Sequence, residues 1–289
     1  MPSPSLDIAA RTDQGKVRKN NEDAYLVYRT GRVLERLDSN IPETELPSGF
    51  SGGGYIMAVA DGMGGMAAGE VASRSALTEA FRLVLRAPKW LLQLDDPSTR
   101  ESEIQAFLDR TKAYLAGMHA ALSRAVAADP SKAGMGTTLT CAYSVGWDLF
   151  VVHVGDSRAY LYREGDLRRI THDHTLAQNL ADAGAIPQEE VAQHPRRNVL
   201  TNVIGGSGGW MRGETHHLLL KPGDRLLVCT DGLNAVLGDE EIVHVLEGER
   251  ESEGACGALI EMALSRGAPD NVTVIVAQYS DGVAPPPTI

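Results

Sequence analysis

Five short segments of the sequence place an aspartate at the end of an apolar stretch, next to glycine or asparagine. They are Asn21-Glu22-Asp23, Val59-Ala60-Asp61-Gly62, Val154-Gly155-Asp156-Ser157, Cys229-Thr230-Asp231-Gly232 and Pro269-Asp270-Asn271. Taken singly, each aspartate fits a turn, because Asp-Gly is a common turn pair. Strand ends gather at the rims of a sandwich, however, and carboxylates collected at one rim repel one another unless cations neutralise them. Together the five segments predict a site for divalent cations.

The chemistry of the donors indicates which cations such a site would hold. Carboxylate oxygens with no cysteine or histidine at zinc-ligand spacing favour Mg²⁺ or Mn²⁺. Gly62, directly after Asp61, exposes a backbone carbonyl and lets the chain approach closely. Two such cations in one site commonly bind phosphate oxygens and clamp a nucleophile and a leaving group. The sequence therefore points to phosphate-ester chemistry.

Short strands and two helical blocks must position these residues. Apolar runs rich in Val, Ile, Leu and Tyr predict strands at 5–12, 22–29, 54–60, 137–145, 149–154, 157–163, 167–170, 215–220, 224–230 and 271–279. Apolar residues at helical spacing predict helices at 68–86, 101–128, 175–183, 239–247 and 254–266. Helices segregated from runs of strands indicate an α+β layered domain.

Four segments read as connections or ends. Residues 30–53 are predicted to be a flexible surface excursion, and residues 87–100 a link between the two long helices. Residues 184–214 have little periodicity, and a connection of that length is often functional. Residues 281–289 form a Pro-rich tail that we expect to be disordered.

Composition excludes several classes of protein. The chain has 289 residues, and its 38 acidic residues exceed its 27 basic ones by 11, which argues against binding to nucleic acid. No apolar run approaches the roughly 18 residues of a membrane span, and the first residues lack the pattern of a secretory signal. Three cysteines make no disulfide framework. We therefore expect a cytoplasmic protein.

Eight ordered segments carry a resemblance to a known family. They are TDQGKVRKNNEDAY (12–25), VADGMGGMAAGEVAS (59–73), GMGTTLT (134–140), HVGDSRAYLYREGDLRRIT (153–171), DHTLAQNLADAGAI (173–186), HPRRNVLTNVIG (194–205), LLVCTDGL (226–233) and PDNVTVIV (269–276). The chain resembles the metal-dependent Ser/Thr protein phosphatases of the protein phosphatase 2C family, in their compact bacterial form. The resemblance implies a four-layer αββα sandwich, a single catalytic domain over 1–280 and a flap at about 175–205.

The resemblance also implies a role for each matching residue. Asp61 matches the carboxylate that bridges two metal ions, and Gly62 would donate its backbone carbonyl. Asp231 and Asp270 match the remaining direct ligands, and Asp23 matches a ligand that binds directly or through water.

Four further positions carry implied roles around that pair of ions. Asp156 matches the ligand of a third, weaker ion, which it would share with Asp231, and Arg18 matches the side chain that binds the substrate phosphate. Glu22 is expected to lie beside the ligands. His174 is expected to support them or to anchor the flap, and not to bind metal itself.

The implied reaction is hydrolysis of phosphoserine and phosphothreonine monoesters by a metal-activated hydroxide, with two or three Mn²⁺ or Mg²⁺ ions. Met63 stands where some relatives have a histidine, so the general acid is not identified, and neither is the effect of Asn234. The expected partners are phosphorylated proteins, among them Ser/Thr kinases and their substrates, and we expect a monomer. Two alternatives stay open: a non-catalytic pseudophosphatase, although no metal ligand is lost, and a two-metal phosphodiesterase acting on nucleotides.

Overall fold

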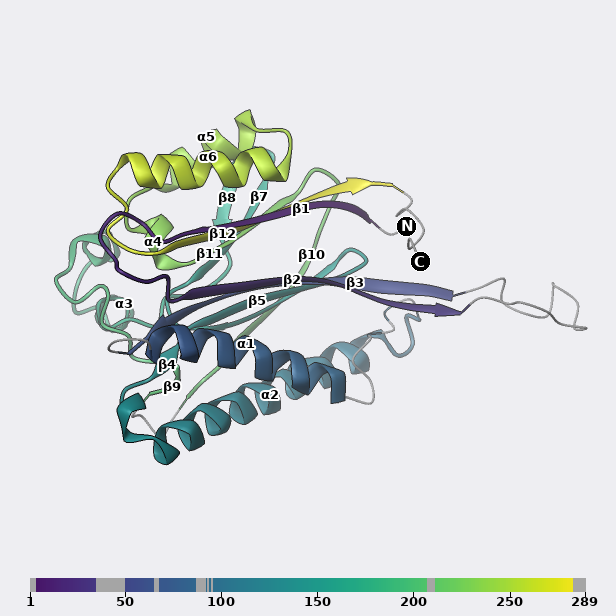
Figure 1. Ribbon diagram of the computed structural model, residues 1–289. Helices are drawn as coiled ribbons and strands as arrows, with labels where there is room; N and C mark the ends of the chain where they lie inside the picture. Colours follow the sequence, from purple (N-terminus) through teal and green to yellow (C-terminus); the bar gives the residue numbers. More distant parts are fainter. Residues whose placement is uncertain are drawn as a thin grey trace, which may run out of the picture.

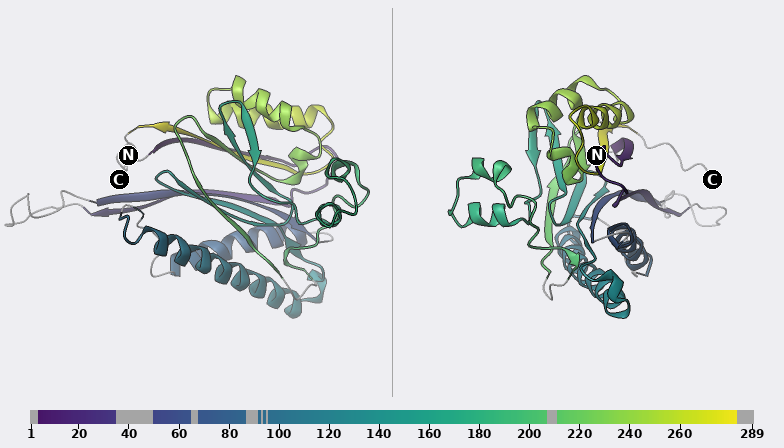
Figure 2. Two further views of the ribbon diagram at one scale, coloured as in Figure 1. Left: turned by 180° about the vertical axis from the view of Figure 1, so that it is seen from behind. Right: turned by 60° about the vertical axis from the view of Figure 1, so that its left-hand side comes forward.

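Two antiparallel sheets pack face to face, and helices cover the outer face of each (Figure 1). The computed structural model describes residues 4–34, 50–64, 68–86, 92, 94, 96–206 and 211–282. Figure 2 shows the same four layers from behind and from the side. The expected α+β fold, a four-layer αββα sandwich, is confirmed.

The first sheet has five strands and joins the two ends of the described chain. Its strands, in spatial order, are β1 (Pro4–Asp13), β12 (Val272–Asp281), β11 (Arg225–Cys229), β7 (Arg158–Arg163) and β8 (Asp166–Arg169). Strand β1 pairs with β12 along its whole length, from Pro4 opposite Asp281 to Asp13 opposite Val272. Strand β1 therefore forms one edge of this sheet, and β12 lies beside it.

The second sheet has seven strands. Their order is β10 (Glu214–Leu219), β6 (Asp148–Val154), β5 (Leu139–Val145), β3 (Phe50–Met63), β4 (Gly136–Thr137) and β9 (Ile204–Gly205), with β2 (Asp23–Leu34) paired to β3. The single strand expected over 137–145 is divided at Thr138. Before it, β4 pairs with the last residues of β3, Gly62 and Met63; after it, β5 pairs with residues 54–59 of the same strand.

Two helix pairs form the outer layers. The helices are α1 (Ala68–Arg86), α2 (Arg100–Ala128), α3 (Leu176–Asp182), α4 (Asp231–Asn234), α5 (Asp239–Gly248) and α6 (Ser252–Ser265), with short 3₁₀ turns at Pro130–Lys132 and Gln188–Gln193. Helices α1 and α2 cover the seven-stranded sheet, and α5 and α6 cover the five-stranded sheet (Figure 1).

Alternation along each strand divides the core into layers. On β3, Met57 and Val59 pack between the sheets, whereas Ala58 and Ala60 face the helices α1 and α2. Strand side chains point to opposite faces in turn, so Asp61 belongs to the face of Met57 and Val59. The pattern that builds the core thus directs the Asp61 carboxylate into the space between the sheets.

The prediction of a surface excursion at 30–53 is wrong at both of its ends. Strands β2 and β3 extend their ladder to Leu34 opposite Phe50. Glycines in this stretch indicated a loop, but Gly53 lies so close to β2 that a Cβ atom there would overlap the carbonyl oxygen of Thr30. Glycine at this position permits close strand pairing. The middle of the predicted excursion, 35–49, lies outside the described residues.

The long connection expected at 184–214 contains more structure than its sequence indicates. It includes the 3₁₀ turn Gln188–Gln193 and the strand β9, and β10 begins at Glu214. The flap segment closes on itself, because Thr175 pairs with Leu200 in an isolated bridge. Most of the predicted tail lies outside the described residues, but Asp281 still belongs to β12.

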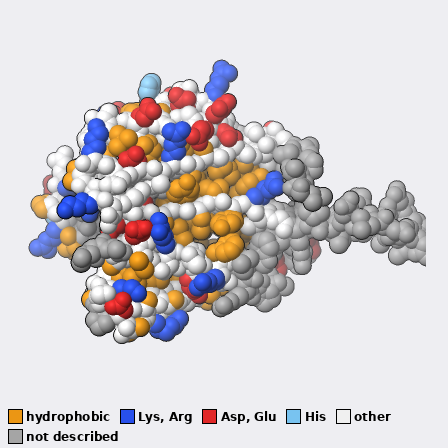
Figure 3. Space-filling model, in the orientation of Figure 1, with side chains coloured by type: hydrophobic (Ala, Val, Ile, Leu, Met, Phe, Trp, Pro, Cys, Tyr) orange, Lys and Arg blue, Asp and Glu red, His pale blue; other side chains and the backbone are white. Residues whose placement is uncertain are grey.

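Hydrophobic side chains gather across the middle of the face seen in Figure 1, with charged side chains around them (Figure 3). Exposed apolar residues of the edge strand β2 include Tyr25 and Tyr28. None of the helices in the described part of the chain is both long and apolar enough to cross a membrane.

Candidate functional site

The five aspartates of the sequence pattern come together at one end of the sandwich. Asp23 begins β2, and Asp61 lies near the end of β3. Asp156 lies just after β6, Asp231 just after β11, and Asp270 just before β12. These strands are antiparallel, so starts and ends alternate along the same rim. The Asp61 carboxylate lies within electrostatic reach of the other four. The predicted clustering of the five carboxylates is therefore what the fold produces.

Strand pairing fixes the position of Asp61. It stands directly opposite Asp23 in the β2–β3 ladder. The Asp61 backbone N–H donates to Thr138 Oγ1 at 2.9 Å, and the Asp61 carbonyl accepts the Thr138 N–H at 2.9 Å. The Thr137 hydroxyl donates to the same carbonyl at 2.8 Å. Two threonines thus hold the Asp61 backbone without using its carboxylate.

Asp23 connects the two sheets. Its Oδ2 accepts hydrogen bonds from the hydroxyls of Thr230, at 2.8 Å, and Thr273, at 2.7 Å, which both belong to the five-stranded side. Its Oδ1 is buried and has no hydrogen-bond partner among the described residues. Burial raises the pKa of Asp23 to about 7, against the lowering effect of the two hydroxyls.

The neighbouring carboxylates, of which Asp156 is buried and Asp61 and Asp231 are partly buried, are also held in an environment that disfavours their charge. Burial, followed by the neighbouring carboxylates, raises the pKa of Asp61, of Asp156 and of Asp231. Asp231 Oδ1 is buried and unpaired within the described structure. Hard oxygen donors, orphaned and mutually repelling, are the set that Mg²⁺ or Mn²⁺ would bind and neutralise. The residues present therefore fit a divalent-cation centre.

Arg18 is a cation that the chain itself supplies at this rim. Its Nη2 donates to Asp270 Oδ2 at 2.5 Å, and about half of its side chain stays exposed. This hydrogen bond raises the pKa of Arg18, with further attraction from Asp61 and Glu22. The structure therefore brings Arg18 to the carboxylates, as predicted, with part of its donor fork directed to solvent.

Asn271 holds the loop that carries Arg18 and Glu22. Its Nδ2 donates to the carbonyls of Gln14 and Asn20, both at 2.8 Å. Its Oδ1 accepts the Glu22 N–H at 2.8 Å. The position of Arg18 at the rim therefore depends on an amide side chain that directly follows Asp270.

Glu22 and Gly62 meet the first turn of α1. The Glu22 carbonyl accepts the Gly62 N–H at 3.2 Å and the Ser73 hydroxyl at 2.7 Å. A Cβ atom at Gly62 would overlap the carbonyl oxygen of Gly69, so only glycine fits here. Burial raises the pKa of Glu22, and Arg18 opposes that effect. Glu22 lies beside the cluster, as expected, and packs against Gly69.

His174 stands behind the Asp156 turn, outside the carboxylate cluster. Its Nδ1 accepts the backbone N–H of Gly155 at 3.0 Å. His153 is fully buried, and its ring bonds to Thr140 and to two backbone carbonyls.

Sequence reasoning missed the side chains that support the ligands. The hydroxyls of Thr138, Thr230 and Thr273 hold Asp61 and Asp23. The signal available was proximity, since Thr230 directly precedes Asp231 and Thr273 follows Asn271 by two residues.

A chain of hydrogen bonds gives Asn234 a structural role. Asn234 Oδ1 accepts the Tyr160 O–H at 3.1 Å, and Tyr160 accepts from Arg158 Nη1 at 3.0 Å. Arg158 in turn forms a two-pronged pair with Asp173, with distances of 2.9 and 2.6 Å.

Met63 ends β3 with 38% of its surface exposed and offers no exchangeable proton.

Comparison with known proteins gives one consistent result. The family model described as protein phosphatase 2C matches residues 48–257. The serine/threonine protein phosphatase PstP of Mycobacterium tuberculosis is 40% identical over 280 residues, which cover 96% of this chain and 45% of that protein. The serine/threonine phosphatase stp of Listeria monocytogenes is 32% identical, covering 93% of this chain and 94% of that protein.

Solved structures agree with the sequence relatives. The catalytic domain of PstP in complex with two manganese ions has a TM-score of 0.71 and 35% identity, covering 96% of this chain and all of that one. The chain spans a little under half the length of PstP itself. The matched residues, the shared fold and the carboxylate rim have one explanation: the chain belongs to the protein phosphatase 2C family.

Proposed function

We propose that this protein is a metal-dependent phosphatase that hydrolyses phosphoserine and phosphothreonine monoesters on proteins. The observation that carries the proposal is the cluster of carboxylates, in which Asp23 and Asp231 each keep a buried unpaired oxygen, beside the half-exposed side chain of Arg18. Relatives that are named serine/threonine phosphatases support it. A pseudophosphatase would have lost metal ligands, and this chain has kept each of those expected.

Asp61 would bridge two Mn²⁺ or Mg²⁺ ions, with the Gly62 carbonyl, Asp231, Asp270 and Asp23 completing their ligands. Asp156 and Asp231 would hold a third ion. The proposal is supported by the collection of these aspartates at one rim and by the two manganese ions of the PstP catalytic domain. When bound, the ions supply positive charge and an activated water for in-line attack on phosphorus.

The protein's own residues bind and orient the substrate. Arg18 offers a planar fork of donors to two phosphate oxygens and remains charged at all relevant pH values. Asn271 keeps the loop of Arg18 in place, and Asp270 orients the guanidinium. Met63 cannot protonate the leaving serine or threonine oxygen, so that proton comes from another donor.

Residues 1–280 would form one catalytic domain, with the flap at about 175–205 influencing the choice of substrate. We expect a cytoplasmic monomer that opposes Ser/Thr kinases. The three cysteines, which are free, are compatible with a reducing compartment. Size-exclusion chromatography with light scattering tests the monomer.

Hydrolysis of p-nitrophenyl phosphate and of phosphothreonine peptides, with Mn²⁺ and with EDTA, tests the function. We expect turnover with Mn²⁺ and none with EDTA, and Asp61→Asn serves as an inactive control. A folded protein with no activity across Mn²⁺ and Mg²⁺ refutes the proposal. Tight phosphopeptide binding without turnover would favour the pseudophosphatase, and preference for bis-p-nitrophenyl phosphate would favour a phosphodiesterase.

A further inference from the structure

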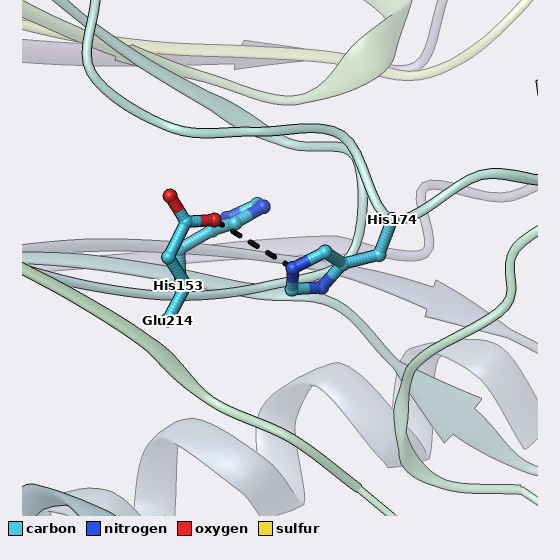
Figure 4. A group of neighbouring side chains, drawn as sticks. All are labelled: His153, His174 and Glu214. Atoms are coloured by element: carbon cyan, nitrogen blue, oxygen red, sulfur yellow. Dashed lines mark ion pairs between the residues drawn. The ribbon is translucent and has the colours of Figure 1, made fainter. Parts of the chain in front are cut away.

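Behind the Asp156 turn, three titratable side chains from distant parts of the chain meet. His153 lies on β6, His174 precedes the flap helix α3, and Glu214 begins β10 (Figure 4). Their nearest nitrogen and oxygen atoms lie within 4.8 Å of one another, an arrangement that could hold a metal ion. The hydrogen bonds of the two rings decide whether it can.

His153 has no lone pair available for a metal ion. Its Nε2 faces the carbonyl oxygens of Gly155 and His172, both at 3.0 Å, and carbonyls only accept, so Nε2 carries the proton. Its Nδ1 lies 2.9 Å from Thr140 Oγ1, whose single hydroxyl proton is shared between this nitrogen and the Ser157 carbonyl at 3.1 Å, so Thr140 covers the remaining ring nitrogen. Burial lowers the pKa of His153 to about 4, so the ring is neutral. His153 is therefore a fixed structural residue.

The proton of His174 is assigned in the same way. Its Nδ1 accepts the Gly155 N–H at 3.0 Å and an Asn202 Nδ2–H at 2.9 Å, so Nδ1 is unprotonated. The orientation of the Asn202 amide is fixed because its Oδ1 accepts the Arg212 N–H at 3.2 Å. His174 Nε2 then carries the proton and points to Glu214 Oε2, 3.6 Å away. Neither ring offers a nitrogen to metal.

His174 instead connects both ends of the flap to the turn of Asp156. The backbone N–H of His174 donates to the Gly155 carbonyl at 2.7 Å, and the backbone carbonyl of His174 accepts the Thr201 N–H at 2.9 Å. Asp173, just before it, is fixed to β7 by the two-pronged pair with Arg158. The imidazole adds a second link, because its Nδ1 accepts both from Gly155 in the Asp156 turn and from Asn202 at the returning end of the flap.

The turn at Gly155 has little freedom to adjust if the acceptor His174 Nδ1 is removed. Gly155 has a φ of +114°, which other residues avoid, and a Cβ atom there would lie 2.5 Å from the Thr138 side chain. Thr138 also bonds the Asp61 backbone and the Ser157 hydroxyl, at 2.9 and 2.8 Å. A displaced Gly155 would therefore move the Asp156 carboxylate relative to the rest of the rim.

We propose that His174 is a positioning residue, which through the shared acceptor Nδ1 couples the placement of the flap to the orientation of Asp156. The inference rests on the proposed function, because it gives Asp156 a cation to bind. The coupling itself is a property of the fold and can be measured without turnover.

Two substitutions separate the acceptor atom from the rest of the ring. His174→Asn places an amide oxygen near the position of Nδ1, whereas His174→Gln places its amide near Nε2 and leaves Gly155 N–H without an acceptor. We expect His174→Gln to speed amide exchange at Gly155, measured by NMR, and tryptic cleavage after the exposed flap residues Arg196 and Arg197. His174→Asn should restore both towards the wild-type rates.

Calorimetric titration with Mn²⁺ provides the second readout. We expect the weakest Mn²⁺ site to lose about tenfold in affinity in His174→Gln, as for one lost hydrogen bond, while the tighter sites are unchanged. Asn202→Ala removes only the flap side of the coupling, and should shift proteolysis and the weakest Mn²⁺ site in the same direction, but less. This third variant keeps the test decisive if a ring substitution unfolds the protein.

Three results would overturn the coupling: equal behaviour of the Asn and Gln variants, faster proteolysis with an unchanged weakest Mn²⁺ site, or loss of every Mn²⁺ site at once. Failure of the proposed function gives a different pattern. A wild-type protein that is inactive with Mn²⁺, but in which the exchange and proteolysis contrast persists, keeps the coupling and rejects the phosphatase.

Discussion

Asp23 and Asp61 are direct cross-strand partners at the end of the β2–β3 ladder, so two carboxylates face each other between the sheets. Directly opposed side chains in an antiparallel pair lie about 5 Å apart, and like charges at that spacing destabilise a sheet. The hydroxyls of Thr230 and Thr273 satisfy one oxygen of Asp23 and leave the other unpaired. The fold therefore contains a destabilising feature that divalent cations would relieve.

The raised pKa of Asp23 predicts how the stability of the metal-free protein depends on pH. With a pKa of about 7 in the folded state and about 4 in the unfolded state, the folded protein binds the extra proton between these values. The contribution of Asp23 to the free energy of unfolding is thus fully present below about pH 4 and is lost as pH rises through about 7. We expect urea unfolding in EDTA to show this decline.

The control for that experiment is Asp23→Asn, which keeps an acceptor for both threonine hydroxyls but cannot titrate. His153 contributes with the opposite sign, because its lowered pKa of about 4 adds stability as pH rises towards 6.5. The difference between wild type and Asp23→Asn removes the His153 contribution. Saturating Mn²⁺ should cancel the decline, since cations bind the ionised carboxylate. Identical pH profiles for the two proteins would show that Asp23 does not titrate in this range.

Substitution of Arg18 should weaken phosphate binding more than it slows turnover. Loss of a charge-assisted hydrogen bond typically costs about 1.5–3 kcal/mol, so Arg18→Ala should lower kcat/KM about 10–150-fold, mainly through KM. Arg18→Lys should recover only part, because an ammonium lacks the planar fork. Lys19→Ala, an exposed neighbour in the same loop, is the matched control. A purely kcat effect would place Arg18 elsewhere in the mechanism.

Asp156→Ala should slow turnover while leaving two Mn²⁺ ions bound. Asp156 follows β6, and Asp231 is the carboxylate that most raises its pKa, which fits the expectation that Asp156 serves only the third ion, shared with Asp231. Calorimetry counts the ions, and the exposed hairpin residue Asp166 provides a control substitution, Asp166→Ala. If Asp156→Ala instead empties the whole site, the assignment of a separate third ion is wrong.

Gly62→Ala should destabilise the protein by about 3 kcal/mol or more, because the added methyl group would overlap the Gly69 carbonyl at the start of α1. Gly248→Ala is the matched control: nothing lies within 4 Å of its added Cβ atom, and alanine favours a helix. Denaturant unfolding measures both. Equal stability of the two variants would mean that α1 can move away from β3 at no cost.

The positions of the helices and strands were largely predictable from the sequence, because apolar residues recur about every 2 residues in a strand and about every 3.6 residues in a helix. Helices α1, α2, α5 and α6 lie within a few residues of their predicted ranges. The error at 30–53 came from glycines such as Gly53, which serve close strand pairing and not a turn. A glycine's role depends on what lies beside it in space, and no local pattern contains that information.

The sequence by itself predicted that the strand-end aspartates would gather, because strand ends of a sandwich meet at its rims, and the family resemblance added Arg18 to Asp23, Asp61, Asp156, Asp231 and Asp270. Only the tertiary structure decided which atoms are free to bind a cation and which are already bonded. The hydroxyls that occupy Asp23, the amide of Asn271 and the shared acceptor of His174 all join residues far apart in the chain. Hydrogen bonds are directional and short, so their partners are settled only when the packing of both sheets brings the atoms within about 3 Å.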